Sequence, residues 1–338
     1  MALLVIHPES SMESEMKVFV TGGNGFIGSR VVRLLHAQGH EIRCLLRESS
    51  QTDRINEIPY EKHIGDVRDV DSLVAGMEGC DGVIHLASIS SWDQIRSPIM
   101  RVVVIDGTRN VMEAAMRAGN LRTVFVSTCA AVNGTKSPEV MNESTEFTLD
   151  PKTYVYAGAK HEAEVLCTEF AAKGLPVITV NPCEVYGPED DDLITASYLL
   201  DALKDWPAMS LHGGTAVAHV EDIADGIIKA LEKGRGGERY ILGGDNLHVR
   251  QVIEMTLESG GQAGKFILQL PNWLTKAVIK GLAAVRLPTP VIPDIVDYGT
   301  LFWFVDCSKA QQELGYTYRP AKETVDDVVS WLQTSGRV

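Results

Sequence analysis

The chain has 338 residues, of which 45% are hydrophobic and 22% are charged, and its formal net charge at pH 7 is -14. This composition predicts a folded chain with one large domain and a smaller one, and it excludes long disordered segments. The acidic balance argues against nucleic acids and anionic membrane surfaces as partners.

The six cysteines are scattered, with no CxxC pair and no accompanying histidine cluster, so we expect reduced core thiols and no metal site. Residues 1–15 contain a short apolar piece that no Lys or Arg precedes. No apolar run reaches the ~18 residues needed to cross a bilayer. We therefore expect a cytoplasmic protein without a membrane partner, with residues 1–15 as a flexible extension.

From residue 17 onward, short apolar runs alternate with amphipathic stretches. The runs predict strands over Lys17–Thr21, Glu41–Arg47, Gly82–Ala87, Arg122–Thr128, Pro176–Pro182 and Glu238–Gly244. The amphipathic stretches predict helices over Phe26–Gln38, Val70–Met77, Val103–Ala118, Tyr156–Lys173 and His219–Lys233. Continuous apolar strands that alternate with helices indicate an α/β fold with a doubly wound parallel sheet, covered by helices on both faces.

The alternation of strands and helices breaks after Gly244. An amphipathic helix is predicted over residues 270–287, and prolines at 288, 290 and 293 predict a stiff loop after it. We expect a smaller C-terminal cap that binds the substrate, made of residues 184–218 and 245–338. The dinucleotide-binding domain is expected over residues 16–183 and 219–244.

A glycine-rich turn follows the first predicted strand and opens the first predicted helix. Residues 21–28 read TGGNGFIG. One glycine permits a sharp turn, one lets the backbone approach a pyrophosphate, and one packs the helix against the strand, while the helix N-terminus faces the negative charge. This context favours a Rossmann dinucleotide site over a mere structural turn. The expected cofactor-binding residues of the turn are Gly22, Gly25, Phe26, Ile27 and Gly28.

The end of the second predicted strand bears on the choice of cofactor. An acidic residue there binds the ribose hydroxyls of NAD, whereas a basic one suits the additional phosphate of NADP. Here Arg47 ends the strand, followed by Glu48 and by hydroxyls at Ser49 and Ser50. We therefore expect NADP(H) as the cofactor, with Arg47 as a binding residue, and NAD(H) stays open as the alternative.

Tyr156 and Lys160 lie four residues apart near the start of a predicted helix, so they share one helix face. A free tyrosine has a pKa near ~10, and a neighbouring ammonium lowers that pKa by stabilising the phenolate. The pair therefore suits proton donation to a carbonyl that receives a hydride. The alternative is a surface tyrosine stacked on a lysine side chain. Ser127 and Thr128 end the preceding strand, and Thr128 is expected to hold the substrate oxygen.

A series of further motifs runs along the chain in a fixed order. They are Gly65–Asp69 (GDVRD), His85–Ala87 (HLA), Gly107–Val111 (GTRNV), Asn181–Pro188 (NPCEVYGP) and His219–Asp222 (HVED). Together with TGGNGFIG and the Tyr156–Lys160 pair, they make the chain resemble the extended short-chain dehydrogenase/reductases from residue 16 to about residue 335. Within that family it is most similar to the dihydroflavonol-reductase group and its bacterial relatives, the hopanoid-associated sugar epimerases.

The resemblance implies roles for individual residues. The catalytic set would be Thr128, Tyr156 and Lys160, with Thr128 standing where the family commonly has serine. The cofactor-binding set would include Asp66 and Val67 at the adenine, Ala87 toward the ribose, Pro182 with Val185 at the nicotinamide amide, and also Leu86, Ser127, Tyr156 and Lys160. Val104 departs from the family, which often has asparagine at that position. A homodimer through helices near residues 103–118 and 156–172 is also implied.

The favoured function is a reductase that transfers hydride between NADP(H) and a small or medium, mostly apolar ketone or aldehyde, with the alcohol as substrate in reverse. A sugar-nucleotide epimerase or dehydratase with tightly bound NAD(P) is the main alternative. Members of that kind usually carry an arginine just before the HVED-like segment, whereas residues 213–218 here contain none. A non-catalytic NADP-binding protein is the second alternative.

Three other features invite a functional interpretation. His85 lies within a predicted strand, where we expect a core histidine and not a catalyst. Glu184 stays open between a substrate contact and a salt bridge of the cap. The consecutive carboxylates of residues 190–192 point apart, which predicts a solvated loop and no metal site.

Overall fold

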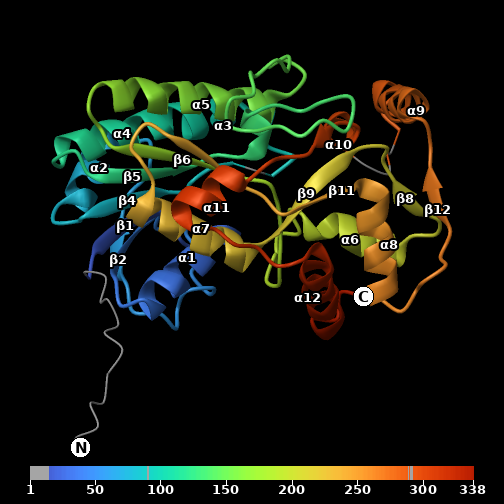
Figure 1. Ribbon diagram of the computed structural model, residues 1–338, viewed down its shortest axis with the longest axis horizontal. Helices are drawn as coiled ribbons and strands as arrows, with labels where there is room; N and C mark the ends of the chain where they lie inside the picture. Colours follow the sequence, from blue (N-terminus) through green and yellow to red (C-terminus); the bar gives the residue numbers. More distant parts are fainter. Residues whose placement is uncertain (1–14, 90, 288, 290–291) are drawn as a thin grey trace, which may run out of the picture.

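The computed structural model describes residues 15–89, 91–287, 289 and 292–338. Its larger part is built on a seven-stranded sheet in the order β10-β6-β5-β4-β1-β2-β3, with every neighbouring pair parallel (Figure 1). The strands are β1 Lys17–Thr21, β2 Glu41–Leu46, β3 Glu61–Ile64, β4 Gly82–His85, β5 Arg122–Val126, β6 Val177–Pro182 and β10 Arg239–Leu242. The expected extension lies outside the described residues except for Glu15.

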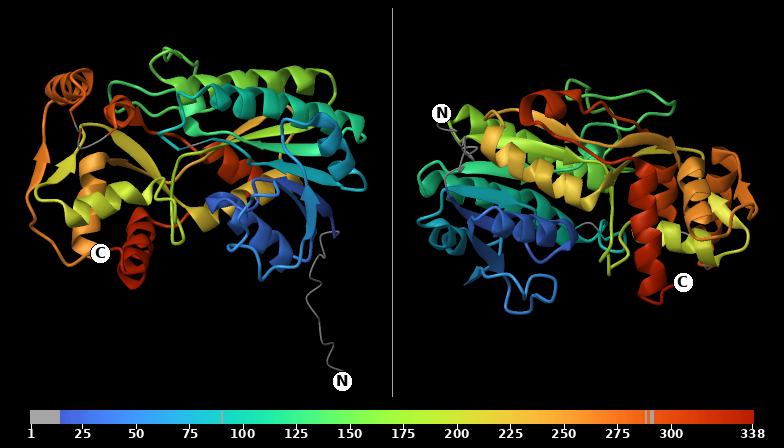
Figure 2. Two further views of the ribbon diagram at one scale, coloured as in Figure 1. Left: turned by 180° about the vertical axis from the view of Figure 1, so that it is seen from behind. Right: turned by 60° about the horizontal axis from the view of Figure 1, so that its bottom comes forward.

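Helices cover both faces of this sheet, as Figures 1 and 2 show. One face carries α1 Phe26–Ala37, α7 Val220–Lys233 and α11 Ser308–Leu314, and the other carries α2 Val70–Met77, α4 Gly107–Arg117 and α5 Val155–Ala172. Each face buries its own apolar cluster, in which strand and helix side chains pack together. The expected Rossmann fold is confirmed.

The helix expected over Val103–Ala118 is part of a longer helical stretch. It begins with α3 Pro98–Arg101 and passes through a π-helical turn, Val102–Asp106, before α4. Val104 is buried within that turn, and its carbonyl accepts a hydrogen bond from the Thr108 hydroxyl at 2.6 Å. Val104, where the family often has asparagine, therefore lies in a π-helical turn, which is wound more loosely than an α-helix.

Strand β3 was not expected from the sequence, because its residues EKHI are mostly polar. It occupies the edge of the sheet, where one side of the strand faces solvent. Glu61 forms ion pairs with Lys17 at 2.7 Å and with Arg43 at 2.8 Å, which tie the edge to the neighbouring strands. Polar side chains are compatible with this position, so hydrophobic periodicity does not reveal it.

The smaller part, here called the cap, contains short strands and its own helices. In one sheet, β9 Gly214–His219 pairs with β7 Glu184–Tyr186, β11 Asp245–His248 and β13 Phe302–Trp303; a second pairs β8 Ala208–Ser210 with β12 Ile267–Gln269. The helices are α6 Ala196–Lys204, α8 Val249–Ser259, α9 Asn272–Ala284, α10 Pro293–Gly299 and α12 Ala321–Thr334. Helix α9 corresponds to the helix expected over 270–287. Pro293 begins α10, whereas prolines 288 and 290 lie outside the described residues.

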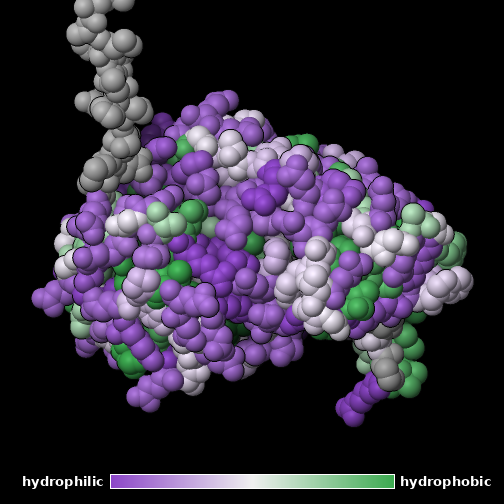
Figure 3. Space-filling model, turned by 90° about the horizontal axis from the view of Figure 1, so that it is seen from below, coloured by the Kyte–Doolittle hydropathy of each residue, from purple (hydrophilic) through white to green (hydrophobic). Residues whose placement is uncertain are grey.

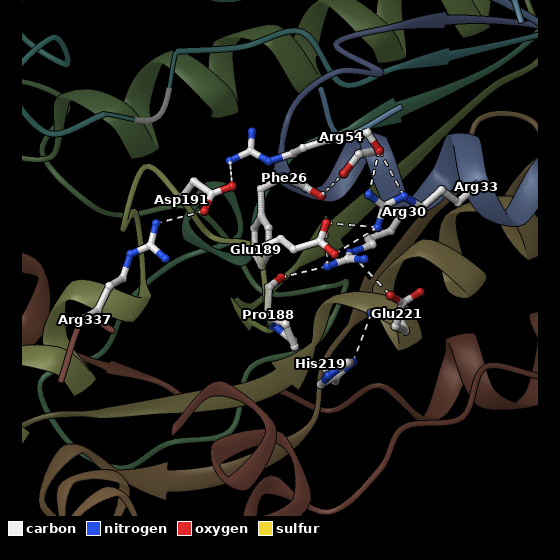
Figure 4. A network of polar contacts seen from close by, with 11 residues as sticks. Phe26, Arg30, Arg33, Arg54, Pro188, Glu189, Asp191, His219, Glu221 and Arg337 are labelled. Atoms are coloured by element: carbon white, nitrogen blue, oxygen red, sulfur yellow. Dashed lines mark hydrogen bonds and ion pairs between the residues drawn. The ribbon is translucent and has the colours of Figure 1, made fainter. Parts of the chain in front are cut away.

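An arginine of α1 connects the dinucleotide-binding part to the loop that follows β7. Arg30 is only 7% exposed, and its guanidinium donates to the Pro188 carbonyl at 2.8 Å. It also forms ion pairs at 3.3 Å with Glu189 and with Glu221 at the start of α7 (Figure 4). This network fixes the entry to the cap against the helix that begins at the glycine-rich turn.

The surface and the interior differ in character. Hydrophilic residues cover most of the face shown in Figure 3, and hydrophobic residues form separate patches over both parts of the molecule. Exposed apolar side chains of the cap include Trp206, Phe266, Trp273, Val285 and Leu287. All six cysteines are free and buried. In the part of the chain that the structure describes, no helix is long and apolar enough to cross a bilayer.

Candidate active site

Two glycines of the glycine-rich turn that follows β1 lie too close to neighbouring backbone to carry a side chain. Gly22 has a φ of +74°, and a Cβ there would lie 2.7 Å from the Ala87 nitrogen. A Cβ on Gly28 would lie 2.0 Å from the Gly22 carbonyl oxygen. Gly25 is the N-cap of α1 and has no side chain to satisfy the first helical N–H groups. These groups are therefore available to an anion such as a pyrophosphate.

A groove of about 940 Å³ runs from this turn along the carboxyl ends of the strands. The structure brings every predicted cofactor-binding and catalytic residue together along it. They are Gly22, Gly25, Phe26, Ile27, Gly28, Arg47, Asp66, Val67, Leu86, Ala87, Ser127, Thr128, Tyr156, Lys160, Pro182 and Val185. The Ser127 hydroxyl is buried and has no hydrogen-bond partner among the described residues. A hydroxyl without a partner and a turn whose backbone is bare at Gly22 and Gly28 fit a bound dinucleotide.

Charged side chains line the groove near the end of β2. Arg47 follows the strand, and its backbone N–H donates to the Ser50 hydroxyl at 3.0 Å. Asp66 is held by Arg68 at 2.7 Å, and this side-chain bond holds the pKa of the Asp66 carboxyl below its usual value. Arg68 also lines the groove and was not predicted. Arg47 and Arg68 therefore both border this end of the groove, and only Arg47 was predicted from the sequence.

Tyr156 and Thr128 meet at the opposite end of the groove. The Thr128 side chain is hydrogen-bonded to the Tyr156 hydroxyl. Burial raises the pKa of Tyr156 to about 12, and the Thr128 bond opposes that rise. We expected Lys160 to lower this pKa, but burial is the dominant effect in this structure. The two hydroxyls nevertheless form the hydrogen-bonded pair that a carbonyl oxygen would contact.

Lys160 lies beneath the tyrosine on the same helix face of α5. It is 3% exposed, and its Nζ donates to the Val126 carbonyl at 2.9 Å while lying 4.9 Å from the centre of the Phe125 ring. Burial lowers the pKa of Lys160 to about 8. The ammonium is thus anchored to the end of β5 at the floor of the groove.

Thr128 owes its position to the turn after β5. It caps the short 3-10 helix Cys129–Ala131, since its Oγ1 accepts from the Ala130 N–H at 3.3 Å. The Asn181 amide donates to the Thr128 carbonyl at 2.8 Å and to Glu164 at 2.6 Å. The Ala130 N–H of this helical turn and the Asn181 amide of β6 therefore hold the threonine in place.

A second cavity, of about 280 Å³, opens from the groove into the cap. The residues that line both spaces are Thr128, Tyr156, Cys183, Glu184, Ile194 and Thr195. Aromatic rings form much of the remaining wall, from Trp92, Tyr186, Tyr198, Tyr298 and Trp303. Among the described residues that line the cavity, none is lysine or arginine. The cavity is therefore suited to an uncharged, mostly apolar compound.

Three further expectations meet different outcomes. His85 is buried and bonded to Thr21 at 2.7 Å and Thr108 at 3.1 Å, which confirms a core histidine. The expectation of a solvated loop is wrong for Asp190, which is fully buried and accepts from the N–H groups of residues 194–196. Glu184 lines the cavity and is in none of the ion pairs found among the described residues. The sequence left a substrate contact of Glu184 open as one of two alternatives, whereas it gave no sign of the buried Asp190.

Residues 18–243 match the model of the NAD dependent epimerase/dehydratase family. A Synechocystis protein named "Putative dihydroflavonol 4-reductase" is 33% identical over 329 residues, covering 95% of each chain. A Stigmatella aurantiaca protein named "4-hydroxy-2-methyl-3-oxo-4-farnesyl-3,4-dihydroquinoline-1-oxide ketoreductase" is 28% identical over 320 residues, covering 90% of this chain and 92% of the relative.

The crystal structure of a nucleoside-diphosphate-sugar epimerase from Pseudomonas aeruginosa superposes with a TM-score of 0.77 at 24% identity, over 96% of this chain and 99% of that one. That likeness concerns the fold alone. The expectation of an NAD(P)-dependent oxidoreductase of the short-chain dehydrogenase/reductase type is confirmed by the family match and the reductase relatives. The chain belongs to the NAD dependent epimerase/dehydratase family.

Proposed function

We propose that the protein is an NADP(H)-dependent reductase of a small or medium, mostly apolar ketone or aldehyde, and that it oxidises the matching alcohol in reverse. The main support for this proposal is that the cofactor groove and the apolar cavity meet and share lining residues. The groove and the apolar cavity share the hydrogen-bonded Thr128 and Tyr156 side chains. A carbonyl held in the cavity would therefore lie beside a proton donor.

The proposed roles follow from the contacts of each side chain. When bound, the nicotinamide supplies or accepts the hydride. The Tyr156 hydroxyl gives its proton to the carbonyl oxygen as that oxygen becomes a hydroxyl, and takes a proton back from solvent afterwards. Thr128 orients the oxygen through its hydroxyl. Lys160 lies beneath, where its ammonium favours the phenolate that remains on Tyr156.

The proposed preference for NADP(H) rests on the cations at the end of β2. Arg47 lines the groove together with Ser50 and Arg68, whereas Glu48 is not among the lining residues. A guanidinium binds a phosphate through charge-assisted hydrogen bonds. The same groove would accept NAD(H), which lacks that phosphate, without using Arg47.

The lining of the cavity favours a reductase over a sugar-nucleotide epimerase or dehydratase. A nucleoside diphosphate carries two phosphates that need cationic partners, and no lysine or arginine lines the cavity among the described residues. The ketoreductase relative from Stigmatella aurantiaca is named for a farnesyl-bearing compound, which suits an apolar wall. A non-catalytic role is disfavoured by the intact pair of hydroxyls above Lys160.

We also propose that residues 184–218 and 245–338 form the substrate-binding part and that the protein is a homodimer. The proposed interface uses residues 103–118 and 156–172. Val165 is 46% exposed on α5 and therefore offers apolar surface within this interface. Sedimentation velocity of the Val165→Glu variant tests this interface. A dimer in the native protein that becomes a monomer in the variant is the expected result.

The experiment that tests the reductase follows the absorbance of NADPH after mixing the protein with a panel of ketones and aldehydes. Oxidation of NADPH that depends on a carbonyl and is lost in Tyr156→Phe is the expected result. Cofactor that co-purifies and stays bound, without oxidation by any carbonyl, would favour the epimerase instead. Turnover that persists in Tyr156→Phe would contradict the role of the tyrosine.

A further inference from the structure

One carboxyl group lies where the cofactor groove opens into the apolar cavity. Glu184 begins β7, directly after Cys183, and lines both spaces. Strand β7 pairs in parallel with the fully buried strand β9, with Glu184 opposite Val217. The backbone of Glu184 is therefore held in a sheet, so its side chain enters the cavity from a rigid element.

The surroundings of this carboxyl offer hydrogen bonds and no cation. The side chains of Thr215 and Tyr186 are its hydrogen-bond partners. Burial raises the pKa of Glu184, and these two bonds only partly oppose the rise. Glu184 is half-buried, and a carboxyl group can accept hydrogen bonds on both of its oxygens. The group therefore has hydrogen-bonding capacity left for a ligand in the cavity.

We propose that Glu184 is a specificity-determining residue that binds a hydroxyl group of the substrate by accepting a hydrogen bond from it. The substrate class is then an oxygenated ketone or aldehyde whose remaining skeleton is apolar. The inference rests on the proposed reductase function and adds the feature by which the cavity selects among carbonyl compounds. A site that hydrogen-bonds a substrate oxygen rejects the analogue that lacks it, because the buried group then loses its partner.

The other candidate ligands fit the cavity less well. A phosphate or carboxylate would face Glu184 with no lysine or arginine on the described wall. The cavity has a second carboxyl, Asp201 on α6, but that residue is exposed and remains in contact with water. Asp201 therefore serves as the matched control.

The test compares benzylacetone with analogues that carry one added hydroxyl, on the chain or on the ring, in the presence of NADPH. The measured quantity is the ratio of kcat/KM for each hydroxylated ketone to that for benzylacetone. The native protein is expected to prefer at least one hydroxylated ketone by roughly tenfold or more. Glu184→Leu should bring that ratio close to one. Glu184→Gln should keep most of it, because the amide oxygen also accepts hydrogen bonds.

Several results would overturn the proposal. They are equal use of all the ketones by the native protein, a preference that survives in Glu184→Leu, and a preference that disappears in Asp201→Asn instead. An effect of Glu184→Leu confined to the KM for NADPH would assign the carboxyl to the cofactor. A loss in Glu184→Gln as large as in Glu184→Leu would show that charge, not hydrogen bonding, is what the site uses.

A binding measurement separates this proposal from the reductase itself. Trp92 and Trp303 line the cavity, so ligand binding there is expected to change tryptophan fluorescence. The ligands are the alcohol derived from benzylacetone and the diols derived from its hydroxylated analogues, none of which requires turnover. If no ketone is reduced, the reductase proposal fails. Tighter binding of a diol that Glu184→Leu abolishes would still support the role of Glu184, and equal binding in both proteins would contradict it.

Discussion

The two parts of the molecule are assembled from the chain in different ways. In the dinucleotide-binding part, β1 to β3 and β4 to β6 each follow one another in space as they do in sequence. In the cap, β9 pairs with β7, β11 and β13, which come from segments between residues 184 and 303 of the chain. The short strand β8 likewise pairs with β12, which lies far from it in the sequence. Local sequence patterns therefore specify the cofactor site, whereas pairings between remote segments shape the substrate cavity. This difference explains why cofactor chemistry is easier to infer than substrate identity.

The largest expected effect concerns the junction of the two parts. Tyr156→Phe removes the proton donor while leaving the ring in the groove, and kcat/KM for carbonyl reduction should fall by about 10²–10⁴-fold. NADPH affinity, measured by fluorescence titration, should change little, because the cofactor groove is otherwise intact. A matching loss of NADPH affinity would instead mean that the hydroxyl serves the cofactor and not the chemistry.

The second expected effect lies wholly within the dinucleotide-binding part. Arg47→Ala removes a guanidinium from the groove, and the KM for NADPH should rise by about 10–100-fold, in line with the loss of a charge-assisted hydrogen bond. The KM for NADH should stay within about twofold of its native value. Steady-state kinetics with both cofactors provides the measurement. An equal rise for both would remove the basis for the proposed preference.

Two glycine substitutions compare how closely the backbone is packed at one position in each part of the molecule. Gly28→Ala would place a Cβ 2.0 Å from the Gly22 carbonyl, so the free energy of unfolding should fall by about 1–3 kcal/mol and NADPH should bind more weakly. Gly281→Ala in α9 meets nothing within 4 Å, and alanine should stabilise that helix by about 0.5–1 kcal/mol. Chemical denaturation of both variants measures these changes. Destabilisation of similar size in both would contradict the contrast.

A further expected effect is a pH dependence of stability that arises in the core of the dinucleotide-binding part. Burial lowers the pKa of His85 to about 3, below the ordinary histidine value of 6.5. Between these values the unfolded chain binds the additional proton, so stability rises with pH and is lost as the pH falls below 6.5. The His85→Asn substitution should reduce the slope of the free energy of unfolding against pH by up to about 1.4 kcal/mol per pH unit in this range. The exposed His36→Asn variant is the control, and an unchanged slope in His85→Asn would contradict the assignment.

The sequence predicted the central sheet well because its strands are continuous apolar runs. Strand β3 escaped prediction, since an edge strand needs few apolar residues. The predicted site residues gather along one groove, whereas Arg68 and the aromatic wall around Tyr298 were missed. Tyr298 lies far along the chain from Tyr156 and reaches the site only because α10 packs there, where the Ala157 N–H donates to the Tyr298 hydroxyl at 3.1 Å. Such contacts depend on three-dimensional packing and leave no local pattern.

The burial of all six thiols has a practical consequence for spectroscopy. Burial raises the pKa of Cys44 to about 12, and it acts in the same direction on Cys80, Cys167, Cys183 and Cys307, so thiolate-directed reagents would find little of the reactive form. A single cysteine introduced at the exposed Gly281 would therefore label ahead of the native ones. A dye attached there would report on α9 in the otherwise unmodified chain.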